Sequence, residues 1–219
     1  MIGCVIAMDK EAEILLDSME IENIKTMYGK TIHIGKVFGK DVVLVTSGEG
    51  KVNAAAGACA AIAQGVDIVL NFGVAGGLSA DRTEISQLYL IEKAVQYDFD
   101  LVQLSGKPAG TLPDEDENFL PLYCPKGLDF PRRALGTGDR FNDSPIDHAL
   151  LLELGCDIRE MEGGAIAQVC KYAGVPLVSV KAISDVYGSG STTEQFRKNC
   201  KLALLNLKAH LQEILENLE

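Results

Sequence analysis

The stretch IVLNFGVAGG, residues 68–77, decides the fold because it joins an apolar strand to a run of small residues. Its first part, Ile68–Asn71, is strand-like, and Gly73–Gly77 follows directly. A second run, Pro176–Ile183, is strongly β-like and stops at Ser184-Asp185. In a parallel or mixed sheet, ligands bind beyond the carboxyl ends of the strands. These two strand ends are therefore the first places to look for a site.

Around these strands, short apolar runs alternate with amphipathic stretches. Further strands are expected at Ile2–Ala7, Thr31–Val37, Val42–Thr46, Gln87–Val95 and Pro131–Thr137. Helices are expected at Asp9–Ser18, Val52–Ala63, Ser144–Leu154, Gly163–Tyr172 and Thr192–Leu218. Phe38–Asp41 indicates a hairpin, and Leu104–Lys126, rich in proline, glycine and acids, a long loop. The alternation predicts an α/β fold: a single domain over residues 1–219, with a twisted mixed β-sheet flanked by α-helices.

The composition is that of an ordinary globular protein, with 47% hydrophobic and 23% charged residues. The 20 basic and 31 acidic residues give a net charge of −11, which disfavours nucleic acid and anionic membrane surfaces as partners. We find no apolar stretch of about 18 residues that would span a membrane, and no basic start of a signal peptide. The six scattered cysteines include no Cys-x-x-Cys pair, which favours a reducing cytoplasm.

Several common catalytic motifs are absent from the sequence. Ser47–Lys51 has neither the spacing of a phosphate-binding loop nor that of a dinucleotide fingerprint. There is no Gly-x-Ser-x-Gly elbow, so a serine hydrolase is not supported. The histidines His33, His148 and His210 are far apart and lie outside metal-binding patterns. We therefore expect neither a metal nor a cofactor.

Acidic residues instead stand at the ends of the expected strands. Glu11 follows the first strand, Asp185 ends the most β-like run, and two glutamates flank a methionine in Glu160-Met161-Glu162. A carboxyl group held partly desolvated at such a position has a raised pKa, which suits general acid or base catalysis. The side chain of Phe141 is either part of the core or an aromatic plate for a planar ring.

At this point the chain resembles the bacterial 5′-methylthioadenosine/S-adenosylhomocysteine nucleosidases, which are members of the nucleoside phosphorylase superfamily. The resemblance is carried by IAMDKEAE (residues 6–13), SGEGKVNAA (47–55), NFGVAGGL (71–78), TGDRF (137–141), EMEGGAIA (160–167) and AISDV (182–186). These segments follow the family's order and spacing and extend over nearly the whole chain. The implied fold is that of a nucleoside phosphorylase.

The resemblance implies an enzyme that hydrolyses the N-glycosidic bond of its nucleoside and releases adenine and the 5-substituted ribose. Asp185 corresponds to the general acid that protonates purine N7, and Ser184 would orient it. Glu11 corresponds to the base that positions and deprotonates the attacking water. A carboxylate within Met8–Glu11 would repel phosphate, which favours hydrolysis. A phosphate-dependent phosphorylase and a non-catalytic nucleoside-binding protein of the same fold are the alternatives.

For the substrate, the resemblance implies that Glu162 binds the ribose hydroxyls, with Met161 packed beside the sugar. Phe141 would stack on the adenine, the backbone at Asn142 would read the edge of the base, and Met8 would line the site. The predicted substrate-binding residues are Met8, Val74, Pro113, Phe141, Asn142, Glu160, Met161, Glu162 and Lys181.

The chain departs from the family pattern at several positions. Val74 replaces a usual serine, and Lys181 replaces an arginine, whose bidentate fork a lysine cannot form. The resemblance also implies a homodimer in which the loop Leu104–Asp114 reaches the neighbouring site. In that loop Ser105 replaces an aromatic residue that covers the 5′ substituent, and Thr193 stands near an expected lid phenylalanine. Methylthioadenosine, S-adenosylhomocysteine and 5′-deoxyadenosine are therefore all candidate substrates.

Overall fold

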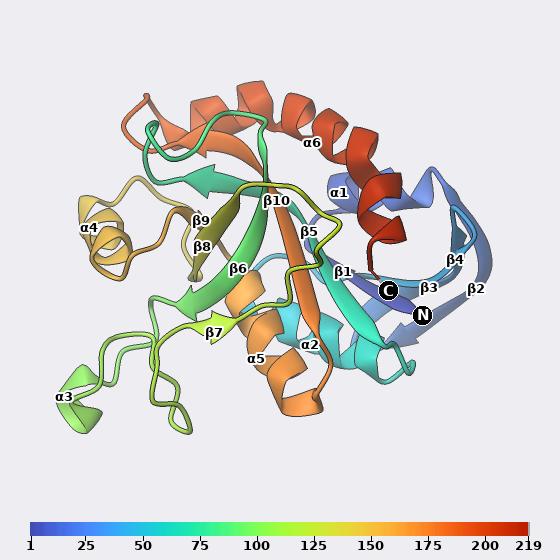
Figure 1. Ribbon diagram of the computed structural model, residues 1–219, viewed down its shortest axis with the longest axis horizontal. Coiled ribbons are helices and arrows are strands. Elements are labelled where there is room, and N and C mark those ends of the chain that lie inside the picture. Colours follow the sequence, from blue (N-terminus) through green and yellow to red (C-terminus); the bar gives the residue numbers. More distant parts are fainter. Residues whose placement is uncertain (219) are drawn as a thin grey trace.

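The computed structural model describes residues 1–218, and a large mixed β-sheet forms its centre (Figure 1). The strands are β1 (Ile2–Ile6), β2 (Met19–Met27), β3 (Lys30–Val37), β4 (Lys40–Thr46), β5 (Ile68–Gly77), β6 (Leu88–Gln96), β7 (Leu120–Pro121), β8 (Arg132–Thr137), β9 (Ile158–Glu160) and β10 (Leu177–Val186). Their order is β10-β6-β8-β9-β5-β1-β4-β3-β2, and β7 pairs with β6. Because β10 also pairs with β5, the strands from β10 to β5 close into a small barrel.

Helices cover both faces of this sheet (Figure 1), which confirms the predicted α/β fold. They are α1 (Asp9–Leu16), α2 (Lys51–Ile62), α3 (Val102–Ser105), α4 (Pro145–Glu153), α5 (Gly163–Ala173) and α6 (Thr192–Glu216). None of the helices within residues 1–218 combines the length and apolar character needed to cross a membrane.

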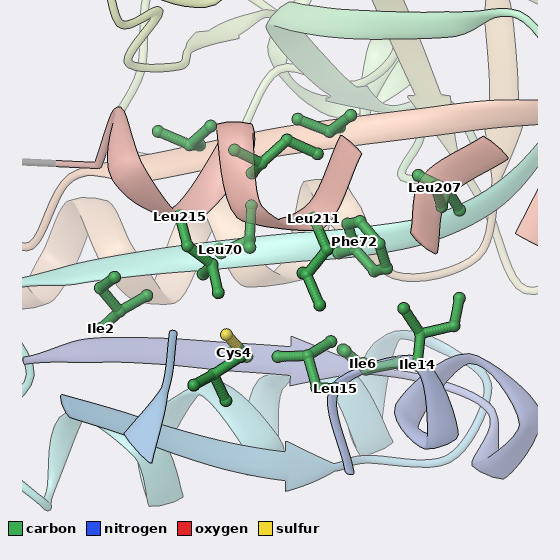
Figure 2. Close-up of a cluster of buried hydrophobic side chains, with 14 of the residues drawn as sticks. Ile2, Cys4, Ile6, Ile14, Leu15, Leu70, Phe72, Leu207, Leu211 and Leu215 are labelled. Atoms are coloured by element: carbon green, nitrogen blue, oxygen red, sulfur yellow. The ribbon is translucent and has the colours of Figure 1, made fainter. Parts of the chain in front are cut away.

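The alternation of side chains along β1 explains the two layers. Cys4 and Ile6 point into the buried cluster beneath α1 and α6, where Leu211 of α6 packs (Figure 2). Val5, between them, belongs to the second cluster, which α2 and α5 cover. Successive residues of a strand face opposite sides of a sheet, so one apolar strand supplies both cores.

The topology brings distant parts of the sequence to one edge of the sheet. β5 lies between β1 and β10 and runs parallel to both. The carboxyl ends of these three strands therefore meet at the same edge. The end of β5 also pairs antiparallel with β9, with Gly76 opposite Arg159. This pairing places the segment that follows β9 beside the same edge.

Some elements differ from the sequence prediction. The pattern does not predict β2, because most side chains of this edge strand are exposed and lack apolar alternation. β9 is only three residues long, too short to show periodicity. The segment 104–126, expected to be a loop, contains the end of α3 and the strand β7. The predicted hairpin is confirmed: Phe38 and Gly39, both with positive φ, connect β3 to β4.

Candidate active site

The carboxyl ends of β1, β5 and β10 enclose a cavity of about 570 Å³, a size typical of small-molecule sites. Most of the predicted site residues line it, namely Met8, Glu11, Val74, Phe141, Glu160, Met161, Glu162, Lys181, Ser184 and Asp185. Within residues 1–218, no group of three or more His, Cys, Asp or Glu side chains is arranged to hold a metal ion.

Glu11 lies in the first turn of α1 and is almost fully buried. One carboxylate oxygen accepts a hydrogen bond from the backbone N–H of Met8 at 3.0 Å, and the other from that of Val74 at 2.8 Å. Burial raises the pKa of Glu11, although both hydrogen bonds and the charge of Lys181 act in the opposite direction. The bond from Val74 uses its backbone, so the valine side chain does not remove it.

Two glycines of β5 make room for the two carboxyl groups predicted to be catalytic. A Cβ at Gly73 would lie 2.5 Å from Oε1 of Glu11, and a Cβ at Gly76 would lie 2.8 Å from Oδ1 of Asp185. Both separations are shorter than any ordinary Cβ contact, so a side chain at either glycine would displace a carboxylate or the strand. Gly73 and Gly76 therefore allow this close approach of the side chains from α1 and β10.

Asp185 lies near the end of β10, where the register with β5 shifts between Ile183 and Asp185. Its Oδ2 accepts a hydrogen bond of 2.8 Å from the hydroxyl of Ser184. Its Oδ1 is buried and has no hydrogen-bond partner among residues 1–218. Burial raises the pKa of Asp185, against the opposing effects of Ser184 and Arg159. A carboxyl group with a raised pKa and one unengaged oxygen can carry a proton to a ligand.

Glu160 lies at the end of β9 and is already fully engaged. Its Oε2 accepts hydrogen bonds from the backbone N–H groups of Glu162, at 3.0 Å, and Gly163, at 2.7 Å. The same oxygen is 3.1 Å from Nζ of Lys181, and Oε1 accepts from the hydroxyl of Thr137 at 2.5 Å. These contacts fix Glu160 in the turn and beside Lys181, on the wall of the cavity.

Lys181 is a buried cation among three carboxylates. Burial acts to lower the pKa of its ammonium group, but the charges of Glu160, Glu162 and Glu11 together raise it. Its hydrogen bond goes to Glu160, and it acts on the other two through charge. Lysine thus supplies a point charge here, as expected from the difference between lysine and arginine.

Glu162 precedes α5, and its Oε1 accepts a hydrogen bond of 2.8 Å from the backbone N–H of Gly50. Burial raises the pKa of Glu162 to about 8, with a further contribution from the charge of Glu160. Gly50, with φ +94°, is the N-cap of α2, and the first residue of the helix, Lys51, donates its N–H to Asp139. The turn between β4 and α2 is therefore fixed against the Glu162 side of the cavity.

An aromatic pair stands at the mouth of the cavity. The side chain of Phe141 is 53% exposed, which excludes a place in the core. Its ring meets that of Phe196 of α6 edge to face, with centroids 5.6 Å apart. An exposed ring on the wall of a cavity is available to stack on a planar ligand.

Arg159 is a site residue that the sequence analysis missed. Its side chain is 11% exposed and lines the cavity. It donates hydrogen bonds to the backbone oxygen of Asn142, at 2.7 Å, and to the hydroxyl of Thr192, at 3.0 Å. The guanidinium also lies 3.8 Å from Oδ1 of Asp185. In the sequence, the one feature that could have pointed to Arg159 is its position next to Glu160. Arg159 belongs to no recognised motif.

Two predicted substrate-binding residues do not line the cavity. Asn142 lies beside it, with its backbone held by Arg159 and its side chain bonded to Asp147. Pro113 is exposed in the segment between α3 and β7, which projects from the body of the protein (Figure 1). Ser105, at the end of α3, is in the same projection.

Comparisons with known proteins agree with this geometry. The phosphorylase superfamily matches residues 1–216. The 5′-methylthioadenosine/S-adenosylhomocysteine nucleosidase of Marinomonas sp. is 32% identical, with 98% of each chain covered. That of Haemophilus influenzae is 33% identical, with 99% of each covered.

Solved structures of similar fold include a nucleosidase and a hydrolase. The 5′-methylthioadenosine/S-adenosylhomocysteine nucleosidase of Colwellia psychrerythraea, solved in complex with adenine, matches with a TM-score of 0.90 and 28% identity. The match covers 99% of this chain and 95% of that one. The futalosine hydrolase of Helicobacter pylori matches with a TM-score of 0.88 and 25% identity, covering 99% and 97%.

Proposed function

This chain belongs to the phosphorylase superfamily, and we propose that it is a purine nucleosidase that hydrolyses 5′-methylthioadenosine and S-adenosylhomocysteine to adenine and the 5-substituted ribose. The observation that carries the proposal is the pair of buried carboxyl groups, Glu11 and Asp185, in separate environments on one cavity. Two titratable groups with different surroundings suit an acid and a base in one reaction.

Asp185 is proposed as the general acid. Cleavage of an N-glycosidic bond leaves negative charge on the departing purine, and a proton placed on N7 relieves it. The raised pKa of Asp185 favours the protonated form that can donate. The hydrogen bond from Ser184 fixes one oxygen, which leaves Oδ1 for the base.

Glu11 is proposed to position the attacking water and to take its proton. Its two backbone hydrogen bonds hold the carboxylate at a fixed place on the cavity wall. Water bound there would face the sugar carbon from which the purine departs, where positive charge develops. A carboxylate close to that carbon would stabilise the charge electrostatically.

The remaining wall would hold the nucleoside. We propose that the free oxygen of Glu162 accepts hydrogen bonds from the ribose hydroxyls and that Met161 packs against the sugar. Phe141 would stack on the adenine, next to the backbone of Asn142. Val74 and Met8 complete the wall near Glu11.

Hydrolysis, and not phosphorolysis, is proposed because of the charge around Glu11. The cation that acts most strongly on Glu11 is Lys181, and its ammonium group is hydrogen-bonded to Glu160. A phosphate anion beside the ionised carboxylate of Glu11 would be repelled by it. Water carries no such penalty.

We further propose a cytoplasmic homodimer in which the segment 104–114 of one subunit covers the partner's cavity. Ser105 and Pro113 of this projecting segment are exposed, which supports the proposal, whereas residues 110–112 are buried. Light scattering coupled to size-exclusion chromatography tests it: a mass near 47 kDa is expected from the 23.5 kDa chain, and a mass of one chain would contradict it.

The experiment that tests the function is adenine release from 5′-methylthioadenosine in buffer without phosphate. Release is expected, and Asp185→Asn and Glu11→Gln should each lower kcat by at least about 100-fold, as removal of an acid or base does. Release only with phosphate would identify a phosphorylase. Binding without release would identify a nucleoside-binding protein.

A further inference from the structure

A set of charged side chains at the cavity has no part in the chemistry described above. Lys10 of α1, Glu49 of the turn before α2, and Arg197 of α6 all line the cavity and are exposed. Thr193, one helical turn before Arg197, lines it as well. Where the family resemblance leads us to expect an apolar lid, this chain has polar groups.

Two of these charges have no partner in the described part of the fold. The carboxylate of Glu49 and the guanidinium of Arg197 make no ion pair or hydrogen bond with another side chain of residues 1–218. The ammonium of Lys10 lies 4.3 Å from the centre of the Phe196 ring, a cation–π contact on the cavity wall. Side chains of both signs of charge therefore line the one cavity.

Their position relative to the nucleoside follows from the proposed function, on which this inference rests. In the proposed complex, the adenine lies next to Asp185 and Phe141, and the ribose hydroxyls lie next to Glu162. The centroid of the Phe196 ring is 5.6 Å from that of Phe141, and the ammonium group of Lys10 lies over the face of the Phe196 ring. A substituent on the 5′ carbon would therefore extend over Phe196 toward these charged groups.

We propose that Lys10, Glu49 and Arg197 form a subsite for a 5′ substituent that ends in both an ammonium and a carboxylate group, as an amino acid does. Arg197 and Lys10 receive the carboxylate, for which the planar guanidinium is well suited. Glu49 receives the ammonium group. The enzyme then prefers S-adenosylhomocysteine to methylthioadenosine, because a methyl group leaves all three charges without a partner.

The test compares four 5′-thioadenosines whose tails differ in charge: butylthio, 3-carboxypropylthio, 3-aminopropylthio and the homocysteine tail. Expected kcat/KM values for the homocysteine tail exceed those for butylthio by about three- to tenfold, the range for a few partly exposed ion pairs. Arg197→Gln lowers the ratio of carboxypropylthio to butylthio, and Glu49→Gln lowers the ratio of aminopropylthio to butylthio. Lys198→Gln, the same charge change on α6 outside the cavity, is the matched control.

Dissociation constants of the same compounds, measured by calorimetry on Asp185→Asn, separate the tail preference from catalysis. Equal affinity for the butylthio and homocysteine tails overturns the inference, as does an unchanged ratio in both Arg197→Gln and Glu49→Gln. Absence of adenine release from every compound contradicts the proposed function instead, and the affinity ratios still decide the subsite. High salt should reduce the preference, since exposed charges are screened.

Discussion

Replacing Lys181 by methionine is the perturbation whose effect follows most directly from the site. The ammonium lies 3.1 Å from Oε2 of Glu160, with both side chains almost completely buried. At an effective dielectric constant of about 20, this contact alone represents about 5 kcal/mol of attraction. Its loss leaves Glu160 uncompensated beside the carboxyl groups of Glu11 and Glu162.

The expected loss in the free energy of unfolding at pH 7 is about 3–5 kcal/mol, the usual effect of breaking a buried pair from one side. The loss shrinks at pH 5, because Glu11 and Glu162, whose pKa values are raised by burial, are more fully protonated there and no longer need the cation. Urea unfolding followed by circular dichroism at both pH values measures it. The double variant Lys181→Met with Glu160→Gln should recover about 2 kcal/mol, since the stranded charge is removed.

Lys198→Met removes an exposed lysine from α6 and serves as the control, with an expected change within about 0.5 kcal/mol. A loss below about 1 kcal/mol for Lys181→Met at pH 7, or an equal loss at pH 5, would refute the reasoning. So would a double variant less stable than the single one. Each of these results would mean that the carboxylates do not depend on this cation.

Three further predictions concern the carboxyl groups and their neighbours. Gly73→Ala displaces Glu11 and should lower kcat about 100-fold with little change in KM, while an unaltered kcat would contradict the close approach at 2.5 Å. The pKa of Glu162 is about 8 in the folded protein and 4.5 ordinarily, so protonated Glu162 stabilises the fold fully below pH 4.5. This contribution is lost as the pH rises through about 8, and the free energy of unfolding should fall with it. Glu162→Gln should abolish that decline. Parallel stability profiles of variant and wild type would oppose this. Arg159→Met removes a cation 3.8 Å from Asp185, so the pKa of that acid rises and the alkaline fall of kcat moves to higher pH; a shift to lower pH would count against the assignment.

The strand ends explain why much of the site was predictable from sequence. Glu11 lies in the helical turn that follows β1, and Asp185 lies near the end of β10; parallel strands carry such ends to one edge. Phe141 could be read as an aromatic plate or a core residue, and only its 53% exposure decides between them.

Other features depend on contacts that no local pattern encodes. The closure of the barrel depends on β10 pairing with both β5 and β6, a long-range contact. Arg159 matters because the antiparallel pairing of β9 with β5 turns it toward Asp185. Glu160 was predicted to bind substrate, yet its oxygens face the N–H groups of its own turn and Lys181. A strand-end position identifies a carboxylate near the cavity but not its partners.

The most direct test of the central claim is the fate of oxygen during turnover. S-adenosylhomocysteine would be converted in water enriched in oxygen-18, with abundant inorganic phosphate present, and the sugar product analysed by mass spectrometry after a single turnover. Water positioned by Glu11 predicts one labelled oxygen in a free 5-substituted ribose and no phosphorylated sugar. A ribose 1-phosphate without label would contradict the account, since the nucleophile would then be phosphate.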